Sequence, residues 1–257
     1  MIVDTHLHVN TDDYKDDLDA VIARAKKAGV KKMIVIGMDE ESSLKAIRIA
    51  EKHEGVYASV GLHPGYVKTG DSAFVHELVS HEKVVGIGET GLDFYWQDEN
   101  RRIQIQSFIK HIEYAMDYDL PLIIHTRNSF QEAYDCLLPY KGRVRGVFHC
   151  FSSTAEDAKK AIELGFYIGV DGPITFKNPK LILDVVREIP LEYLLVETDS
   201  PYLTPMPYRG RRNEPQYLVE VVKHIARIKN VSVETVKQVT TQQAHHLFKL
   251  GGLDDEI

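Results

Sequence analysis

The sequence predicts a (β/α)8 barrel, an α/β fold in which eight parallel strands alternate with helices and close into a cylinder. Three observations lead to this fold class. Short apolar runs alternate with longer amphipathic stretches along the chain, as repeated strand–helix units require. The runs are rich in valine and isoleucine, the composition of strands that are buried on both faces. The first run lacks the glycine-rich phosphate loop that usually follows it in the alternative fold, a doubly wound open sheet.

Eight apolar runs are expected to form the strands. They are residues 2–3, 32–36, 56–60, 84–87, 120–124, 145–148, 166–169 and 193–196. Eight further segments carry apolar residues at helical spacing. They are residues 17–28, 42–53, 100–118, 130–138, 155–164, 179–187, 214–229 and 232–250. Eight units within 257 residues match the usual size of this barrel, so residues 1–257 are expected to form one domain.

The helical assignments rest on apolar side chains that recur every three or four residues, which places them on one helix face. In 17–28 these are Leu18, Val21, Ile22 and Ala25. In 42–53 they are Leu44, Ile47 and Ala50. The longest segment, 100–118, contributes Ile103, Ile105, Phe108, Ile109 and Ile112. The proline-rich stretch 201–215 follows a strand and precedes a helix, so we interpret it as a loop rather than as a domain boundary.

The composition is that of a soluble globular protein, with 44% hydrophobic and 27% charged residues. The formal net charge of −7 argues against a protein that holds nucleic acid on a broad basic surface. Two cysteines, Cys136 and Cys150, cannot form a disulfide framework. There is no signal-peptide pattern and no apolar run long enough to span a membrane, so a cytoplasmic location is expected.

Histidines and carboxylates follow the predicted strands at the end where barrel active sites lie. His6 and His8 are two residues apart, so in an extended chain both rings face the same side. The other ligand-type residues beyond apolar runs are His63, Glu89, His125, His149 and Asp199. The presence of so many histidines and carboxylates at equivalent strand ends predicts a metal site.

Imidazoles and carboxylates without a thiolate suit Zn²⁺, Mn²⁺ or a similar divalent ion. The six candidates His6, His8, Glu89, His125, His149 and Asp199 exceed what one catalytic zinc needs. They suffice for two divalent ions (Zn, Mn or Mg) that share a carboxylate. Glu89 is the natural bridge, since a carboxylate has two oxygens.

One motif is typical of a different kind of site. Residues 86–91, GIGETG, match the glycine pattern of dinucleotide-binding loops and follow a strand. That site also requires a helix to begin on the glycines, and the following LDFYW is not a helix start. We therefore expect these glycines to let the backbone turn tightly beside the metal site.

Taken together, the motifs resemble the TatD family of metal-dependent deoxyribonucleases, within the amidohydrolase-like barrels. The matching segments are DTHLH (4–8), GLHP (61–64), GETGLD (88–93), IIHTR (123–127), HCFS (149–152), ETDSP (197–201) and GRRNEP (210–215). The resemblance implies a barrel hydrolase that cuts DNA phosphodiesters. Ser153 and Gln243 depart from residues that are common in the family, at positions outside the proposed ligands.

By that resemblance, His6 and His8 would bind the first metal and His125 and His149 the second. Glu89 would bridge the two ions. Asp199 would be a ligand that also takes the proton of a metal-activated water, so Glu89 and Asp199 are the expected catalytic residues.

Substrate contacts are expected from His63, Arg127 and Arg211, with Arg209 and Arg212 nearby, because arginine recognises phosphate with two hydrogen bonds. For the arginine loop the alternatives are a solvated basic segment or pairing with a carboxylate. Phe94, Tyr95 and Trp96 could stack on a base or simply pack against one another. The expected substrate is DNA, as single strands or ends.

Three residues near the expected ligands are assigned supporting positions. Asp4 and Asp93 are expected to orient ligands rather than to bind metal. Cys150, next to His149, is expected to pack away from the metals, because successive side chains of a strand alternate in direction.

Two other functions remain open. The first is a small-molecule amidohydrolase, esterase or phosphoesterase that uses the same dinuclear site, since a fold does not fix a function. The second is a non-catalytic metal-binding scaffold. An intact set of ligands for an open dinuclear centre disfavours the scaffold.

Overall fold

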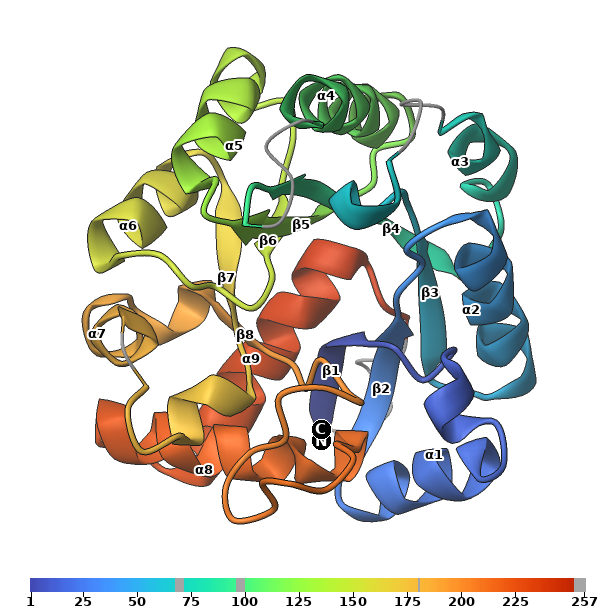
Figure 1. The fold of residues 1–257 in the computed structure, drawn as a ribbon. Helices are drawn as coiled ribbons and strands as arrows, with labels where there is room; N and C mark the ends of the chain where they lie inside the picture. Colours follow the sequence, from blue (N-terminus) through green and yellow to red (C-terminus); the bar gives the residue numbers. More distant parts are fainter. Residues whose placement is uncertain (68–71, 96–99, 180, 252–257) are drawn as a thin grey trace.

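Eight parallel strands surround a common axis in the computed structural model, with the helices outside them (Figure 1). The structure describes residues 1–67, 72–95, 100–179 and 181–251. Neighbouring strands pair in chain order, from the first to the eighth. The strands are β1 (Ile2–Leu7), β2 (Val30–Val35), β3 (Val56–Val60), β4 (Val84–Asp93), β5 (Leu122–Arg127), β6 (Gly146–Phe148), β7 (Phe166–Val170) and β8 (Leu194–Val196). The predicted (β/α)8 barrel is confirmed.

The helices follow the strands as the alternating pattern predicts. They are α1 (Leu18–Lys27), α2 (Glu40–Lys52), α3 (Ala73–Leu78), α4 (Arg101–Asp117), α5 (Phe130–Leu137), α6 (Ala155–Glu163), α7 (Leu181–Glu188), α8 (Leu218–Lys229) and α9 (Val233–Phe248). The sequence-based set omits α3, whose six residues are too short to show a clear helical period. Among the helices of the described residues, none has both the length and the apolar character needed to cross a bilayer.

Short 3₁₀ helices occupy several of the loops. They are η1 (Asp12–Tyr14), η2 (Pro64–Tyr66), η3 (Leu138–Tyr140), η4 (Gly172–Thr175), η5 (Leu191–Tyr193) and η6 (Pro215–Tyr217). The stretch 201–215 between β8 and η6 is a loop, as expected.

Strand β4 is longer than the expected run 84–87, and its glycines do not form a turn. Gly91 has φ +134°, and a Cβ atom there would lie 2.1 Å from the carbonyl oxygen of His125 on β5. Gly88, with φ +146°, would place a Cβ atom 2.5 Å from the carbonyl oxygen of Ile123. The expectation of a tight turn is therefore wrong: the glycines let β4 run close beside β5, which places Glu89 in the middle of a strand.

The seam between β8 and β1 is closed by the segment that follows β8. The Asp199 amide donates to the His6 carbonyl at 2.9 Å, and the His8 amide donates to the Ser200 carbonyl at 2.7 Å. The buried carboxylate of Asp4 accepts from both the amide (3.0 Å) and the hydroxyl (2.6 Å) of Thr198. The seam thus fixes Asp199 beside His6 and His8.

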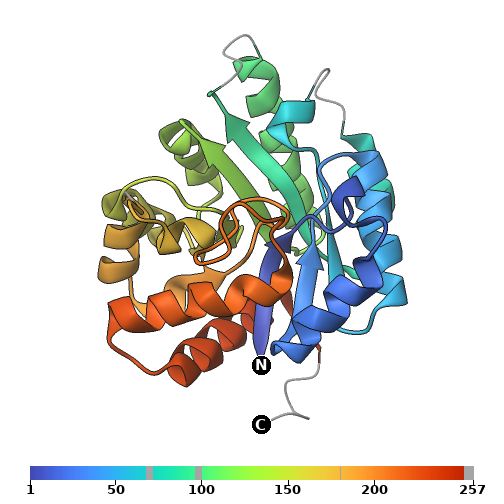
Figure 2. The ribbon, with the colours of Figure 1, turned by 60° about the horizontal axis from the view of Figure 1, so that its bottom comes forward.

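Helix α9 closes the amino-terminal end of the barrel, where it crosses behind the centre of the ring in Figure 1. Figure 2 shows the amino terminus at this same end. The apolar side chains that pack together here are Val3, Ile34, Ile36, Val85, Ile123, Val147 and Leu195 from the strand region and Ala244, Leu247, Phe248 and Leu250 from α9 and its end. Gln243 accepts a hydrogen bond from the Tyr167 hydroxyl at 2.9 Å, so the barrel accommodates this departure from the family pattern.

Candidate metal centre

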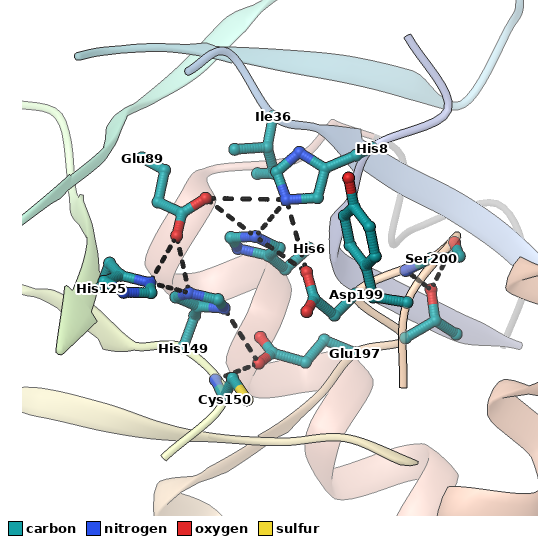
Figure 3. Close-up of polar contacts among 12 residues, drawn as sticks. His6, His8, Ile36, Glu89, His125, His149, Cys150, Glu197, Asp199 and Ser200 are labelled. Carbon is teal, nitrogen blue, oxygen red and sulfur yellow. Dashed lines mark hydrogen bonds and ion pairs between the residues drawn. The ribbon is translucent and has the colours of Figure 1, made fainter. Parts of the chain in front are cut away.

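Six side chains from five strands and their following loops meet at the carboxyl ends of the strands (Figure 3). His6 and Glu89 lie within β1 and β4, and His125 lies within β5. His8 and His149 directly follow β1 and β6, and Asp199 is the third residue after β8. The six are His6, His8, Glu89, His125, His149 and Asp199. His6 is fully buried and Glu89 is 3% exposed. The structure therefore brings together every side chain that the sequence suggested as a metal ligand.

The two oxygens of Glu89 face two different groups of histidines. Its Oε1 lies 2.9 Å from His125 Nδ1 and 2.8 Å from His149 Nε2. Its Oε2 lies 3.5 Å from His6 Nε2 and 3.6 Å from His8 Nε2. This division is the arrangement that a carboxylate bridging two metal ions requires.

Asp199 completes the group around His6 and His8. Its Oδ1 lies 3.6 Å from His6 Nε2 and 3.4 Å from His8 Nε2, and the two ring nitrogens are 3.1 Å apart. Atoms bonded to one tetrahedral metal at about 2.0–2.1 Å lie about 3.3 Å from one another. The spacing of these atoms therefore fits a divalent ion.

The second group, His125 and His149, has the same character, with His125 Nδ1 and His149 Nε2 3.2 Å apart. A neutral imidazole has one N–H and one lone pair, and a carboxylate has only lone pairs. Lone pairs that converge in a buried space repel one another unless a cation lies between them. The donor set of imidazole and carboxylate suits borderline divalent metals.

Asp93 orients His125, as expected from the sequence. Its Oδ2 lies 3.3 Å from His125 Nε2, which places the N–H of the ring on that nitrogen. Once Nδ1 has lost its proton, its lone pair points toward Glu89 and His149, as a ligand atom must. Asp4 differs, because it holds Thr198 and so positions the segment of Asp199 rather than a ligand ring.

His63 presents a hydrogen-bond donor to the centre. Its Nδ1 accepts from the amide of Gly65 at 3.0 Å, so the neutral ring carries its proton on Nε2. That Nε2 lies 3.5 Å from Glu89 Oε1. A donor at this position suits an oxygen acceptor better than a metal ion.

Burial and neighbouring charges set the protonation of the centre. Burial lowers the pKa of His6 to about 3 and that of His63 to about 4, so both rings are neutral near pH 7. Burial opposes the charge of Glu89, but its interactions with the surrounding histidines outweigh burial and hold its pKa well below the ordinary value. Burial also opposes the charge of His125, but Asp93 and Glu89 raise its pKa to about 9.

Glu197 is a buried carboxylate that the sequence reasoning did not single out. It is fully buried, and its Oε1 lies 3.7 Å from Nδ1 of His149 and accepts from the amide of Cys150 at 2.5 Å (Figure 3). It therefore contacts the outer edge of a candidate ligand. Its position two residues before Asp199 in ETD was the available signal, since residues i and i+2 of an extended chain face the same side.

The expectation that Cys150 turns away from the centre is wrong. Strand β6 ends at Phe148, and Cys150 has φ +43°, so strand alternation does not apply to it. Its sulfur lies with carboxylate oxygens of Asp171 and Asp199, all within 4.8 Å of one another.

Two exposed tyrosines lie at the edge of the centre, and the sequence reasoning did not identify them. Tyr66 in η2 is 49% exposed, with its ring centroid 6.0 Å from that of His63. Tyr202, after β8, is 51% exposed, with its ring centroid 6.2 Å from that of His8. Their signal in the sequence was position alone, three residues after His63 and after Asp199.

Arginine side chains stack on two of the aromatic rings that follow Glu89. The guanidinium of Arg127 lies 3.8 Å from the ring centroid of Tyr95, and that of Arg101 lies 4.1 Å from Phe94. Both contacts are cation–π interactions. Trp96 lies outside the described residues.

The arginines of the loop 201–215 differ in their surroundings. Arg212 pairs with Asp17 at 2.8 Å and Glu214 at 3.1 Å, which is the carboxylate pairing considered as an alternative. Arg209 stacks on Phe176 at 4.1 Å. Arg211 is exposed, and the hydrogen bonds recorded for it come from its main chain. The structure does not bring Arg211 into contact with the candidate ligands.

Known proteins resemble this chain over nearly its whole length. The sequence model of the family described as "TatD related DNase" matches residues 3–249. A Bacillus subtilis protein named uncharacterized metal-dependent hydrolase YabD is 40% identical, and the alignment covers 97% of this chain and 100% of that protein. The crystal structure of YjjV, a TatD homologue from Escherichia coli K12, matches with a TM-score of 0.90 at 30% identity, over 97% of this chain and 98% of that one.

Proposed function

The chain belongs to the TatD-related DNase family and is a metal-dependent hydrolase, and from this we propose that it hydrolyses phosphodiester bonds of DNA. The proposed substrate is a single strand or a strand end. The proposed ligands are His6 and His8 for one divalent ion and His125 and His149 for another, with Glu89 shared between them. Asp199 is proposed as a ligand of the first ion.

The division of Glu89 between two histidine groups carries this proposal. Oε1 lies 2.8–2.9 Å from one group and Oε2 lies 3.5–3.6 Å from the other, which supports a pair of adjacent cation sites. Two divalent ions held there would neutralise the oxygens of a phosphodiester and make a bound water more acidic. Zinc, manganese and magnesium all remain candidates for the ions.

We assign the proton of the attacking water to Asp199. Burial opposes its charge, but His8 and His6 outweigh this and lower its pKa, so it is a carboxylate at neutral pH. An ionised carboxylate inside a buried centre can accept or orient a proton. In this proposal Glu89 holds the two ions at a fixed separation, and Asp199 handles the proton.

Substrate recognition is proposed for groups at the rim. The Nε2–H of His63 points into the centre and is placed to donate to a phosphate oxygen. The exposed rings of Tyr66 and Tyr202 flank the centre, where they can stack on bases irrespective of sequence. Arg127 remains a proposed phosphate contact, although it stacks on Tyr95 in this conformation. Arg211 could reach a phosphate only from the more distant loop.

These contacts engage only a short stretch of nucleic acid, in keeping with the acidic chain. A protein with net charge −7 lacks the broad basic surface that holds long duplexes. Positive charge confined to the metal centre would bind the scissile phosphate and little else. We therefore expect weak binding to DNA without metal, and turnover that depends on metal.

A nuclease assay on end-labelled single-stranded and duplex DNA tests the proposal. Cleavage is expected with Mg²⁺, Mn²⁺ or Zn²⁺, and not after metal removal or in Glu89→Gln. A parallel panel of model carboxylic esters, amides and phosphoesters tests the small-molecule alternative. Turnover of that panel together with intact DNA would reject the nuclease function and favour a small-molecule hydrolase.

A further inference from the structure

We propose that Cys150, Asp171 and Asp199 form a further site for a thiophilic divalent cation such as Zn²⁺, beside the dinuclear centre. The site is separate from the proposed nuclease ligands except for Asp199, which both would use. It takes a different donor set, one thiolate and two carboxylates. The inference rests on the proposed function only through that shared residue.

The three side chains converge although they come from three different segments. Cys150 follows β6, Asp171 follows β7 and Asp199 follows β8. Their sulfur and carboxylate oxygen atoms lie within 4.8 Å of one another. Donors around one zinc, bonded at about 2.0–2.3 Å, lie about 3.3–3.8 Å apart. Side-chain movements of about 1 Å or less therefore bring all three to a single ion.

Asp171 supplies an independent indication that a ligand belongs here. Its side chain is 2% exposed, and its Oδ2 has no hydrogen-bond partner among the described residues. A buried carboxylate oxygen without a partner is costly, because it has lost its water and gained nothing in return. A cation bonded to this oxygen removes that cost.

The surroundings hold a further acidic group. Glu197 is fully buried and contacts the amide of Cys150, so a third carboxyl group adjoins the cluster. In the described part of the chain, the ion pairs of Glu197 and Asp199 are made with histidines, and Asp171 makes none. A divalent cation can take the place of the protons that buried carboxyl and thiol groups otherwise hold.

A cavity gives an ion access to the site. Cys150 and Asp171 form the polar end of a cavity of about 150 Å³, and Phe151, Pro173 and Ile182 line its apolar wall. Cys150 is only half-buried. A cation bound by three protein donors could therefore keep a water ligand in the cavity, as open zinc sites do.

The donor set selects the metal. A thiolate favours Zn²⁺ and its spectroscopic substitutes Co²⁺ and Cd²⁺ over Mg²⁺, which prefers oxygen ligands. Cys150 would bind as thiolate and release its proton to solvent. Because Asp199 is shared, occupancy of this site would change how Asp199 is held beside His6 and His8.

Titration of the metal-free, full-length protein with Co²⁺ tests the site, because a cobalt–thiolate bond gives a near-ultraviolet charge-transfer band. The wild type is expected to show this band and to bind one equivalent more than Cys150→Ser, which should lack the band. Asp171→Asn should lower the Co²⁺ affinity of the binding step that produces the band by at least about tenfold, or 1.4 kcal/mol. Cys136→Ser, which removes the chain's other cysteine, is the matched control and should behave as wild type.

The inference is overturned if the wild type gives no band, if Cys150→Ser keeps it, or if Cys136→Ser loses it. DNA cleavage measured on the same preparations separates the two proposals. A band without cleavage supports this site and rejects the nuclease function. Cleavage without a band rejects this site alone.

Discussion

The two ends of the barrel interior are built from the same strands with opposite chemistry. On each of five strands or its extension, an apolar residue packs in the α9 layer and a candidate ligand lies two to four positions later. The pairs are Val3 and His6, Val85 and Glu89, Ile123 and His125, Val147 and His149, and Leu195 and Asp199. The spacings of two, in β5 and β6, keep both members on one side of an extended strand.

The longer spacings occur where the backbone is irregular. Val3 and His6 are three positions apart, and the pairing of β1 with β2 shifts between Asp4 and Leu7. A similar shift in the pairing of β4 with β5 falls between Ile87 and Thr90, around Glu89. Irregular register in β1 and β4 therefore accompanies the candidate ligands His6 and Glu89.

Packing at the apolar end stabilises the fold, whereas the polar end leaves buried groups without hydrogen-bond partners. Leu247 and Phe248 of α9 are almost fully buried against the strands. At the other end, Nδ1 of His6 and of His8 has no hydrogen-bond partner among the described residues. Such an arrangement persists only when the surrounding structure fixes it, as is typical of functional sites.

The sharpest test of this contrast replaces the two residues of β4. Glu89→Gln should reduce metal-dependent cleavage by on the order of 10³-fold or more, the scale seen when one electrostatic stabiliser of a transition state is removed. It should also lower the stability of the metal-free protein, because His125 and His149 lose the buried charge that pairs with them. Val85→Ala should lower stability too, but the folded enzyme should keep its activity. Activity and urea unfolding are measured on both, and activity retained in Glu89→Gln would reject the contrast.

Truncation in α9 should affect stability alone. Phe248 is 2% exposed, so Phe248→Ala should reduce the free energy of unfolding by about 3–5 kcal/mol. Activity per folded molecule at low temperature should match that of wild type. Urea unfolding and a nuclease assay on the folded fraction provide the check, and a selective loss of activity would show that the two ends are coupled.

Removal of an orienting carboxylate should have an intermediate effect. Asp93→Ala leaves Nε2 of His125 without its partner and allows the ring to rotate. Metal affinity or activity should fall about 10- to 100-fold, less than for Glu89→Gln. Competition with a chelator measures the affinity. An affinity equal to that of wild type would mean that His125 is held by other contacts.

The smallest expected effect concerns a histidine that is buried yet fully hydrogen-bonded. Nε2 of His111 accepts from the Leu62 amide at 3.0 Å, and Nδ1 donates to the Ser107 carbonyl at 2.8 Å. Burial lowers the pKa of His111 to about 4. The unfolded chain therefore binds a proton at a higher pH than the folded one, and stability falls as the pH drops from about 6.5 to about 4.

The size of that loss is about 2 kcal/mol for this residue. Urea unfolding of metal-free wild type and His111→Gln at pH 7 and pH 4.5 isolates it from the other histidines. The variant should lose less stability than wild type over this interval. Equal losses would mean that His111 is already exposed to protons in the folded state.

Much of the barrel and of the candidate cluster could be predicted because both follow from one-dimensional patterns. Apolar runs at regular spacing give parallel strands, and the carboxyl ends of those strands meet at one face. Histidines and carboxylates at those ends therefore lie close together, whatever conformation the loops adopt. The six candidate ligands converge for this reason.

The missed features depend on local geometry that periodicity does not encode. Cys150 reverses direction because its φ is positive, so alternation gave the wrong side. Glu197 contacts His149 and the Cys150 amide rather than the Glu89 carboxylate, so its sequence position alone did not single it out. The tautomer of His63 depends on the Gly65 amide, and the positions of Tyr66 and of the arginines depend on loop conformation.

The central claim is that cleavage requires two cations that share Glu89 as a ligand. A metal titration tests this claim most directly. Metal-free enzyme is titrated with Mn²⁺, an ion that disfavours the thiolate site, while cleavage of end-labelled single-stranded DNA is followed. Cleavage should reach its plateau at two bound equivalents in wild type and stay near background throughout in Glu89→Gln. A plateau at one equivalent, or cleavage without added metal, would contradict the dinuclear account.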